Sequence, residues 1–353
     1  MYTRTSTIRK TLRSGTHTNT RVVANGIGLT ENVRGETGKV EIVGTIDKNN
    51  NKEEIEFRKE YVEPVVVAYI VTRGGGQSVD VRVTNVTSTG CEIFLEEPDD
   101  QNHNPETVVY IVMEKGSHVT ENGYRIEANF HTTETYRRGG QRDFKGDEIT
   151  FEKIFSSIPA VLHNLNTYNN GTFSSTMVQN VSPEGFELSQ ELAETKKTPA
   201  EEKIAWIAFE PMSGAGFITD VKGESAIVTA TRNAGVDNLP GITIDFKSNF
   251  SQRPNIVVKG QSMNGSDGYW ARSAGAWSKN SVKTFAEEDQ RANKERSHVA
   301  ETFGYVAFDG DALIMTNSAE GVRTSDIFSL ETLDIRQPLV LTWEATSFSN
   351  IFF

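Results

Sequence analysis

Side chains that could do chemistry occur in this sequence, but they are poorly grouped. The loop EEPDDQNHN, residues 96–104, brings carboxylates and an imidazole together, and Asp99, Asp100 and His103 are its candidate contacts to a glycan or a metal ion. Its spacing matches neither a calcium loop nor a zinc site. A solvated loop is therefore the competing interpretation, and we predict no metal site and no cofactor.

A second candidate is the segment GSDGYWARSAGAW, residues 265–277. Tyr269, Trp270 and Trp277 are amphipathic aromatic residues of the kind that stack on sugars or anchor interfaces. The alternative is packing in a core, and it applies most to Trp277. We take Tyr269 and Trp270 as candidate carbohydrate-binding residues.

Catalysis finds little support in the sequence. The six histidines are scattered, without a recognisable nucleophile–base arrangement, and Cys91 falls where a core residue is expected. The glycine-rich stretches RGGGQ (73–77) and RRGGQR (137–142) lie between expected strands, where they favour flexible turns over a phosphate-binding loop. We predict that the protein is not an enzyme.

Composition limits the partners. The chain has 353 residues and a formal net charge of -12, which disfavours a nucleic acid or an anionic membrane as partner, because both attract clustered lysine and arginine. A single cysteine excludes an intramolecular disulfide. We find no apolar run long enough to span a membrane and no apolar core of a signal peptide. We expect synthesis in a host cytoplasm and no membrane insertion.

A threefold repeat organises the elements that position these residues. Each copy has an alternating phrase, a proline that opens an apolar strand, a turn, and a closing strand led by an aromatic residue. The prolines are spaced by 159 − 64 = 95 and 254 − 159 = 95 residues; they are Pro64, Pro159 and Pro254. The residues that end the turns are Cys91, Phe186 and, in a looser third copy, Phe285.

The local patterns indicate β-structure. VDVRVTNV places Val79, Val81 and Val83 on one face of a strand, with polar residues on the other. We expect Gly90 and Gly185 in the turns to have positive φ. The predicted fold is all-β, with three tandem antiparallel β-sandwich domains after an extended N-terminal arm. The predicted boundaries are 1–35 for the arm, 36–121, 122–222 and 223–318 for the domains, and 319–353 for an extension that resembles the start of a further unit.

At this point the residues resemble the H-type lectin domain. The resemblance is carried by EPVVVAYIVTRGGGQSVDVRVTNVTSTGCEIFL with VVYIVMEKG, and by IPAVLHNLNTYNNGTFSSTMVQNVSPEGFELS with IAWIAFEP. ETGKVEI, residues 36–42, resembles the first strand of that family. The resemblance covers residues 36 to about 310 as three copies, mostly at core and turn positions, which carry fold rather than function.

The resemblance implies a homotrimer with sugars bound at subunit edges. It also implies that Arg82, nine residues before the turn residue Cys91, helps to hold sugar hydroxyls. By the same count Met177 and Ala276 stand at this place in the second and third copies, so their sugar binding is in doubt. A solvated or interfacial arginine is the competing interpretation for Arg82.

The first 30 residues hold no acidic residue and eight threonines, a composition typical of an extended arm. The candidate assembly residues of this arm are Arg4, Arg9, Lys10, Arg13 and Arg21. Together with the repeats, the arm favours a non-enzymatic structural protein of a virion, such as a phage capsid decoration, tail or fibre component, that contacts other virion proteins and host surface glycans. The alternative is a soluble carbohydrate-binding lectin or adhesin.

Overall fold

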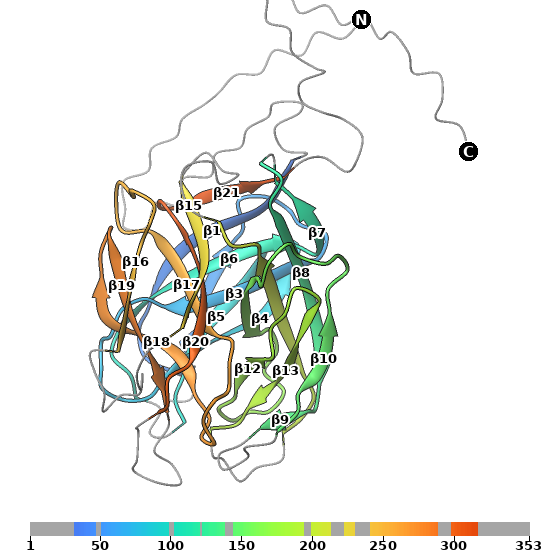
Figure 1. Ribbon diagram of the computed structural model, residues 1–353. Helices are drawn as coiled ribbons and strands as arrows, with labels where there is room; N and C mark the ends of the chain where they lie inside the picture. Colours follow the sequence, from blue (N-terminus) through green and yellow to red (C-terminus); the bar gives the residue numbers. More distant parts are fainter. Residues whose placement is uncertain are drawn as a thin grey trace, which may run out of the picture. The chain divides into compact units, whose positions relative to one another are not determined.

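The computed structural model describes residues 32–46, 51–98, 102–120, 122–137, 144–193, 199–212, 222–229, 241–288 and 298–316. They belong to one compact unit, residues 1–317, and the elements in this part are β-strands (Figure 1). The predicted assembly residues of the arm and the extension 319–353 lie outside the described residues. No helix in the described part is long and apolar enough to cross a membrane.

The same set of six strands occurs three times, and we call the sets repeats 1, 2 and 3. Repeat 1 contains β1 (Val33–Ile42), β2 (Glu53–Glu56), β3 (Pro64–Ile70), β4 (Asp80–Thr87), β5 (Gly90–Glu96) and β6 (Glu106–Glu114). Repeat 2 contains β8 (Arg125–Thr133), β10 (Asp147–Thr150), β11 (Ala160–Leu165), β12 (Ser175–Gln179), β13 (Gly185–Glu191) and β14 (Glu202–Phe209). Repeat 3 contains β15 (Gly223–Thr229), β16 (Ile242–Asp245), β17 (Asn255–Gly260), β18 (Trp270–Trp277), β19 (Ser281–Glu287) and β20 (Thr302–Phe308).

Each repeat is a sandwich of two antiparallel sheets. The inner sheets have the orders β1-β6-β3, β8-β14-β11 and β15-β20-β17, and the outer sheets have the orders β2-β5-β4, β10-β13-β12 and β16-β19-β18. Three short strands are additional to this pattern: β7 (Gly116–Val119), β9 (Tyr136–Arg137) and β21 (Ala312–Met315). The prolines at residues 64, 159 and 254 mark the starts of β3, β11 and β17, as the sequence predicts.

The inner sheets are buried on both faces. In β3, Val66 and Ala68 belong to the core inside repeat 1, whereas Val65, Val67 and Tyr69 belong to a core that also contains residues of repeats 2 and 3. A strand covered on both faces must be apolar throughout, and this explains the continuous run VVVAYIV. The three repeats therefore share one central core.

The edge strands of the inner sheets, β3, β11 and β17, contact one another in this core. Side chains of one repeat form hydrogen bonds with backbone groups at the sheet edge of the preceding repeat. Asn166 Nδ2 donates to Val66 O at 2.9 Å, and Gln261 Oε1 accepts from Val161 N at 3.0 Å. An unpaired sheet edge would otherwise leave backbone groups without partners.

The ring of repeats closes within one chain. After repeat 1, β7 pairs with β8 of repeat 2; after repeat 2, Met212 forms a bridge to Ser225 of β15. After repeat 3, β21 returns to repeat 1 and pairs with β1, with Ala312 opposite Thr37 (Figure 1). Each contact is head-to-tail, and three such contacts make a closed ring.

The structure corrects the expected role of the turn glycines. In these turns positive φ occurs at Asn85, Asn180 and Gly275, at 49°, 53° and 84°, whereas Gly90 and Gly185 are not among the residues with positive φ. Instead, a Cβ on Gly90 or Gly185 would collide with a carbonyl oxygen of the strand opposite, β2 or β10. These two glycines are required by close approach of two backbones rather than by φ.

Candidate binding groove at the repeat boundaries

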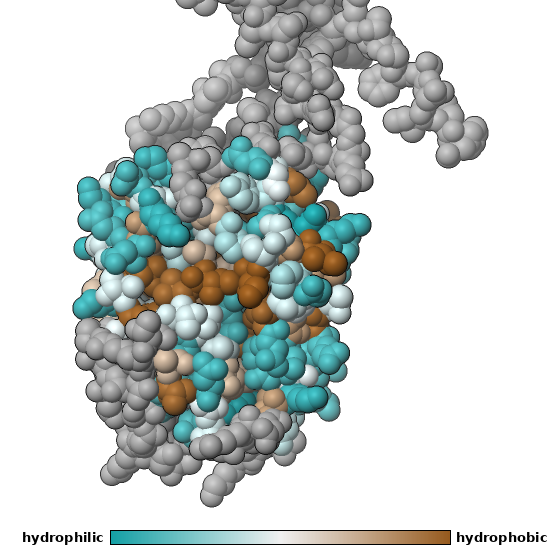
Figure 2. Space-filling model, viewed as in Figure 1, coloured by the Kyte–Doolittle hydropathy of each residue, from teal (hydrophilic) through white to brown (hydrophobic). Residues whose placement is uncertain are grey.

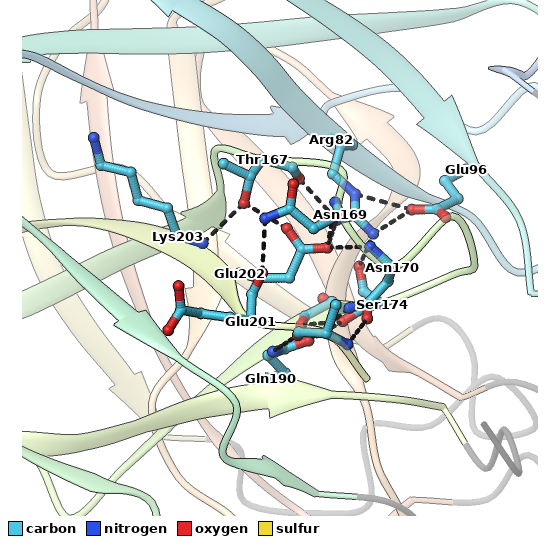
Figure 3. A network of polar contacts seen from close by, with 12 residues as sticks. Arg82, Glu96, Thr167, Asn169, Asn170, Ser174, Gln190, Glu201, Glu202 and Lys203 are labelled. Carbon is cyan, nitrogen blue, oxygen red and sulfur yellow. Dashed lines mark hydrogen bonds and ion pairs between the residues drawn. The ribbon is translucent and has the colours of Figure 1, made fainter. Parts of the chain in front are cut away.

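Arg82 forms the centre of a buried polar network between repeats 1 and 2 (Figure 3). Its Nε and Nη2 donate to Glu96 Oε2 at 3.0 and 2.7 Å, and its Nη1 lies 3.4 Å from Glu202 Oε1 in repeat 2. Nη1 and Nη2 also donate to the backbone oxygens of Thr167 and Ser174. The guanidinium thus links a carboxylate of each repeat with the backbone of repeat 2.

These contacts give Arg82 a role other than the sugar binding that the resemblance implies for it. The residue is 1% exposed, and its donors point at protein acceptors, so a sugar hydroxyl has no access to them. The polar face of β4 is buried because repeat 2 covers it, which no pattern within the strand reveals. The alternative reading, an interfacial strand arginine, agrees with the structure.

The boundary between repeats 3 and 1 has the same construction. Arg272 Nη1 lies 2.7 Å from Glu287 Oε2, and its Nη2 lies 3.1 Å from Glu106 Oε1 in repeat 1. Arg272 stands opposite Phe285 in its sheet, as Arg82 stands opposite Phe94. The counterpart of Arg82 in repeat 3 is therefore Arg272.

The sequence prediction of Ala276 was wrong because it took Phe285 as the residue that ends the turn. The structure gives that place to Val282, which pairs with Ile244 as Cys91 pairs with Ile55. An irregularity between Ser273 and Trp277 lengthens this turn, so counting back from an aromatic residue fails.

The boundary between repeats 2 and 3 obtains its cation from elsewhere. Met177 stands at the place of the arginine, as the sequence indicates, opposite Ser189. Arg137 from β9 takes over, with Nη1 at 3.1 Å from Glu191 Oε2 and a hydrogen bond from Nη2 to the backbone oxygen of Ser266 in repeat 3. A buried arginine–glutamate pair therefore stands at all three boundaries.

One candidate residue, His103, lies beside these pairs. His103 is buried, with Nδ1 at 2.5 Å from Glu97 and Nε2 at 2.8 Å from Glu106. Burial lowers the pKa of His103, but the hydrogen bonds to Glu106 and Glu97 outweigh this and raise its pKa above the usual value. His298 bridges Glu288 and Glu301 in the same way in repeat 3. The predicted contacts Asp99 and Asp100 lie outside the described residues.

The candidate aromatic residues Tyr269 and Trp270 are each 4% exposed, so they do not present a stacking surface to a sugar. Tyr269 donates to Ser262 O at 2.9 Å. Trp270 donates from Nε1 to Val79 O of repeat 1 at 2.9 Å and packs on Phe173 of repeat 2. Trp270 is therefore an interface anchor, the second of the two roles that the sequence suggested, whereas Tyr269 packs on His298 and Phe303 of its own repeat.

An open groove of about 630 Å³ lies beside the Arg82 network, on the boundary of repeats 1 and 2. Its lining combines amide, hydroxyl and amine side chains with two aromatic residues. The residues from repeat 1 are Lys52, Val62, Glu63, Pro64, Thr84, Asn85, Val86, Thr87 and Ser88, and those from repeat 2 are Phe130, Asn166, Thr167, Tyr168, Asn169 and Lys203.

The groove is held in shape by the network beneath it. Glu202 accepts a hydrogen bond from Thr167 Oγ1 and from the backbone nitrogens of Asn169 and Asn170, the latter two at 2.9 Å (Figure 3). Tyr168 lies over the Arg82 guanidinium, 5.0 Å from ring centre to Cζ. The loop of residues 167–170 therefore has a fixed conformation at the groove floor.

At the rim, Lys203 Nζ lies 3.7 Å from the centre of the Phe130 ring. The lining contains neither histidine nor cysteine, and its amide, hydroxyl and aromatic side chains offer hydrogen bonding and stacking. No group of residues suited to hold a metal ion is found in the described part. Sequence reasoning missed this groove because its residues come from two repeats, and only the polar, aromatic stretch TYNNG hinted at it.

No family model matches this chain, and no solved structure matches it. A similar protein is halomucin of Haloquadratum walsbyi (strain DSM 16790 / HBSQ001), which is 26% identical over 289 residues, or 77% of this chain. The match covers 3% of halomucin, so the chain spans a small fraction of the length of this relative.

Proposed function

We propose that this chain is a non-enzymatic structural protein of a virion, built of three H-type lectin-like repeats, and that it binds a glycan in the groove between repeats 1 and 2. The groove is the observation that carries the glycan-binding part. Sugars present many hydroxyls and flat apolar faces, and amide, hydroxyl and aromatic side chains complement both.

A structural role accounts for the construction of the body. Buried arginines and a shared core join the repeats, so the chain is suited to carry load or to hold a surface rigidly. Two boundaries are crossed by an ion pair, Arg82–Glu202 and Arg272–Glu106, and the third by the hydrogen bond from Arg137 to Ser266 O. Burial raises the pKa of Cys91, the single cysteine, to about 12. Its thiol therefore stays protonated at neutral pH and is a poor nucleophile. Figure 2 shows an apolar band across one face, which offers a contact surface to other virion proteins.

A homotrimer, as the resemblance implies, would need a contact surface other than the boundaries between the three repeats. Within one chain the three repeats already close a ring through β21 and β1, so the threefold arrangement is complete without a second copy. Light scattering on the full chain distinguishes the two cases. The mass of one chain supports a self-contained ring, whereas three times that mass supports trimerisation through other residues.

Glycan binding is tested on an array of immobilised neutral and acidic oligosaccharides, followed by calorimetry with any glycan retained. Phe130→Ala and Lys203→Gln change the groove rim without touching the Arg82 network, and each is expected to weaken binding at least about tenfold, or 1.4 kcal/mol. Lys153→Gln, an exposed lysine of repeat 2, is the matched control. Equal binding by all variants, or no retained glycan, contradicts the proposed site.

The place in a virion is tested through the N-terminal arm. A chain lacking residues 1–31, which keeps β1 whole, is expected to lose association with particles while it keeps glycan binding. The second candidate, a soluble lectin, is supported by the same groove. The lectin hypothesis is favoured if removal of the arm changes neither particle association nor cell binding.

A further inference from the structure

One position is shared by the three edge strands that meet in the central core. Tyr69 on β3, Asn164 on β11 and Lys259 on β17 are separated by 164 − 69 = 95 and 259 − 164 = 95 residues. All three side chains are buried, with exposed fractions of 1%, 3% and 5%. The ring thus places a phenol, a carboxamide and an amine at equivalent sites in its interior.

The amine of Lys259 has an unusual environment. Its Nζ donates to Asn164 Oδ1 at 3.1 Å, and in the described part of the chain no carboxylate lies within ion-pair distance of it. Burial lowers the pKa of Lys259, and the negative charge of Asp80 opposes this only in part. A buried ammonium group without an adjacent carboxylate is costly, and loss of its proton turns the amine into a nucleophile.

The carboxamide of Asn164 is held as an electrophile. Its Oδ1 accepts from Ala68 N at 3.1 Å as well as from Lys259, and its Nδ2 donates to Val81 O at 2.9 Å. Two donors on a carbonyl oxygen polarise its carbon in the manner of an oxyanion hole. The four residues come from all three repeats, so the geometry exists only when the ring is closed.

The attacking and accepting atoms are close. Since Lys259 Nζ is 3.1 Å from Asn164 Oδ1 and a carbonyl bond measures about 1.2 Å, Nζ lies within about 4.3 Å of Cγ. A near-attack arrangement requires roughly 3–3.5 Å, so the reaction needs the amine to move toward Cγ from its place in this hydrogen bond. Water, which would compete by hydrolysis, is excluded by the apolar residues of the shared core.

We propose that Lys259 and Asn164 form an intramolecular isopeptide bond that joins repeat 3 to repeat 2. The Nζ lone pair attacks Cγ, the Nζ–Cγ bond forms, and the Cγ–Nδ2 bond breaks. One proton passes from Nζ to Nδ2, which leaves as ammonia, so no oxidant and no cofactor is needed.

His163, next to Asn164 in the chain, does not compete for the proton. Its Nδ1 lies 2.7 Å from Thr176 Oγ1 and its Nε2 lies 2.8 Å from Gly260 O. Burial, followed by the charge of Lys259, lowers the pKa of His163 to about 3, so the ring is neutral and both nitrogens are engaged. Its contact with Gly260 instead helps to hold β17 against β11.

The test is the intact mass of the full chain, purified without denaturation. The isopeptide bond is expected to lower the mass by about 17 Da, one ammonia, relative to the sequence. Trypsin is then expected to release a branched peptide that joins residues 154–196 to residues 248–272, because a linked Lys259 is not cleaved. A folded protein with the full sequence mass overturns the proposal.

Variants separate this reaction from other losses of ammonia. Succinimide formation at an Asn–Gly pair such as Asn170–Gly171 also removes about 17 Da. Lys259→Met is expected to restore the full mass if the bond is an isopeptide, and Lys203→Met is the lysine control that keeps the lower mass. A loss that persists in Lys259→Met, without a branched peptide, refutes the cross-link. The mass of the protein without substitutions decides whether ammonia is lost. A variant that fails to fold therefore leaves that result unaffected.

Discussion

Replacing Arg82 by methionine tests whether the buried ion pairs hold the ring together. Methionine is what repeat 2 carries at this position, as Met177, but there Arg137 supplies the missing charge. Repeat 1 would lose its cation without a substitute. Glu96 would lose two hydrogen bonds and Glu202 its ion pair, and both side chains would stay buried.

The expected cost follows from this geometry. Removing one partner of a buried ion pair costs about 3–5 kcal/mol, because an uncompensated charge remains. Glu202 keeps its hydrogen bonds to the loop 167–170, so most of the cost falls on Glu96. If residues 32–316, roughly 285 residues, unfold together, the unfolding entropy is about 0.6 kcal/mol/K, and the melting temperature should fall by about 5–8 °C.

The assay is calorimetric unfolding, together with denaturation in guanidinium chloride, of Arg82→Met, Glu96→Gln and the double variant. The double variant should recover part of the loss, because the stranded charge is gone, and the cycle yields the coupling energy. Lys153→Met, an exposed control, should change stability by less than about 0.5 kcal/mol. A loss below about 1 kcal/mol for Arg82→Met, or no recovery in the double variant, refutes the reasoning.

Two further predictions concern pH and the turns. Hydrogen bonds to Glu288 and Glu301 outweigh burial and raise the pKa of His298 to about 9, above its usual 6.5, so its stabilisation is complete below pH 6.5 and is lost as the pH rises through 9. At about 1.4 kcal/mol per pKa unit, the free energy of unfolding should fall by up to about 3 kcal/mol over this pH window. His298→Gln should flatten the dependence of stability on pH. The same dependence in both proteins contradicts this prediction. Gly185→Ala should cost about 1–3 kcal/mol in urea denaturation, because its Cβ meets the backbone oxygen of Ile149, whereas Gly76→Ala has open space and should be neutral; equal effects of the two would refute the close-approach argument.

Much of the local structure could be predicted from the sequence. The alternation in VDVRVTNV identified β4 and the face formed by Val79, Val81 and Val83, which pack in the core of repeat 1. The period of 95 residues located β3, β11 and β17. These features depend on neighbours in the chain, since side-chain alternation and turns are set within a few residues.

The candidate site was harder to predict, because burial by another repeat leaves no signal in the local pattern. Nothing in the local sequence shows that Arg82 on β4 and Trp270 on β18 are buried, yet other repeats cover both side chains. In repeat 3 a longer turn shifted the register, which concealed Arg272. Side chains alternate with a period of two along a strand, so a small error in counting misassigns the residue that faces a neighbour.

By itself the sequence determined that this protein is all-β, that it repeats with a period of 95 residues, and where β3, β11 and β17 begin, because these depend on short-range sterics and hydrophobic alternation. Only the tertiary structure decided that the repeats close into a ring within one chain through β21 and β1. It also decided that Lys259 meets Asn164, and that the groove is built from two repeats. These contacts join residues far apart in the chain, and packing against another repeat sets their geometry.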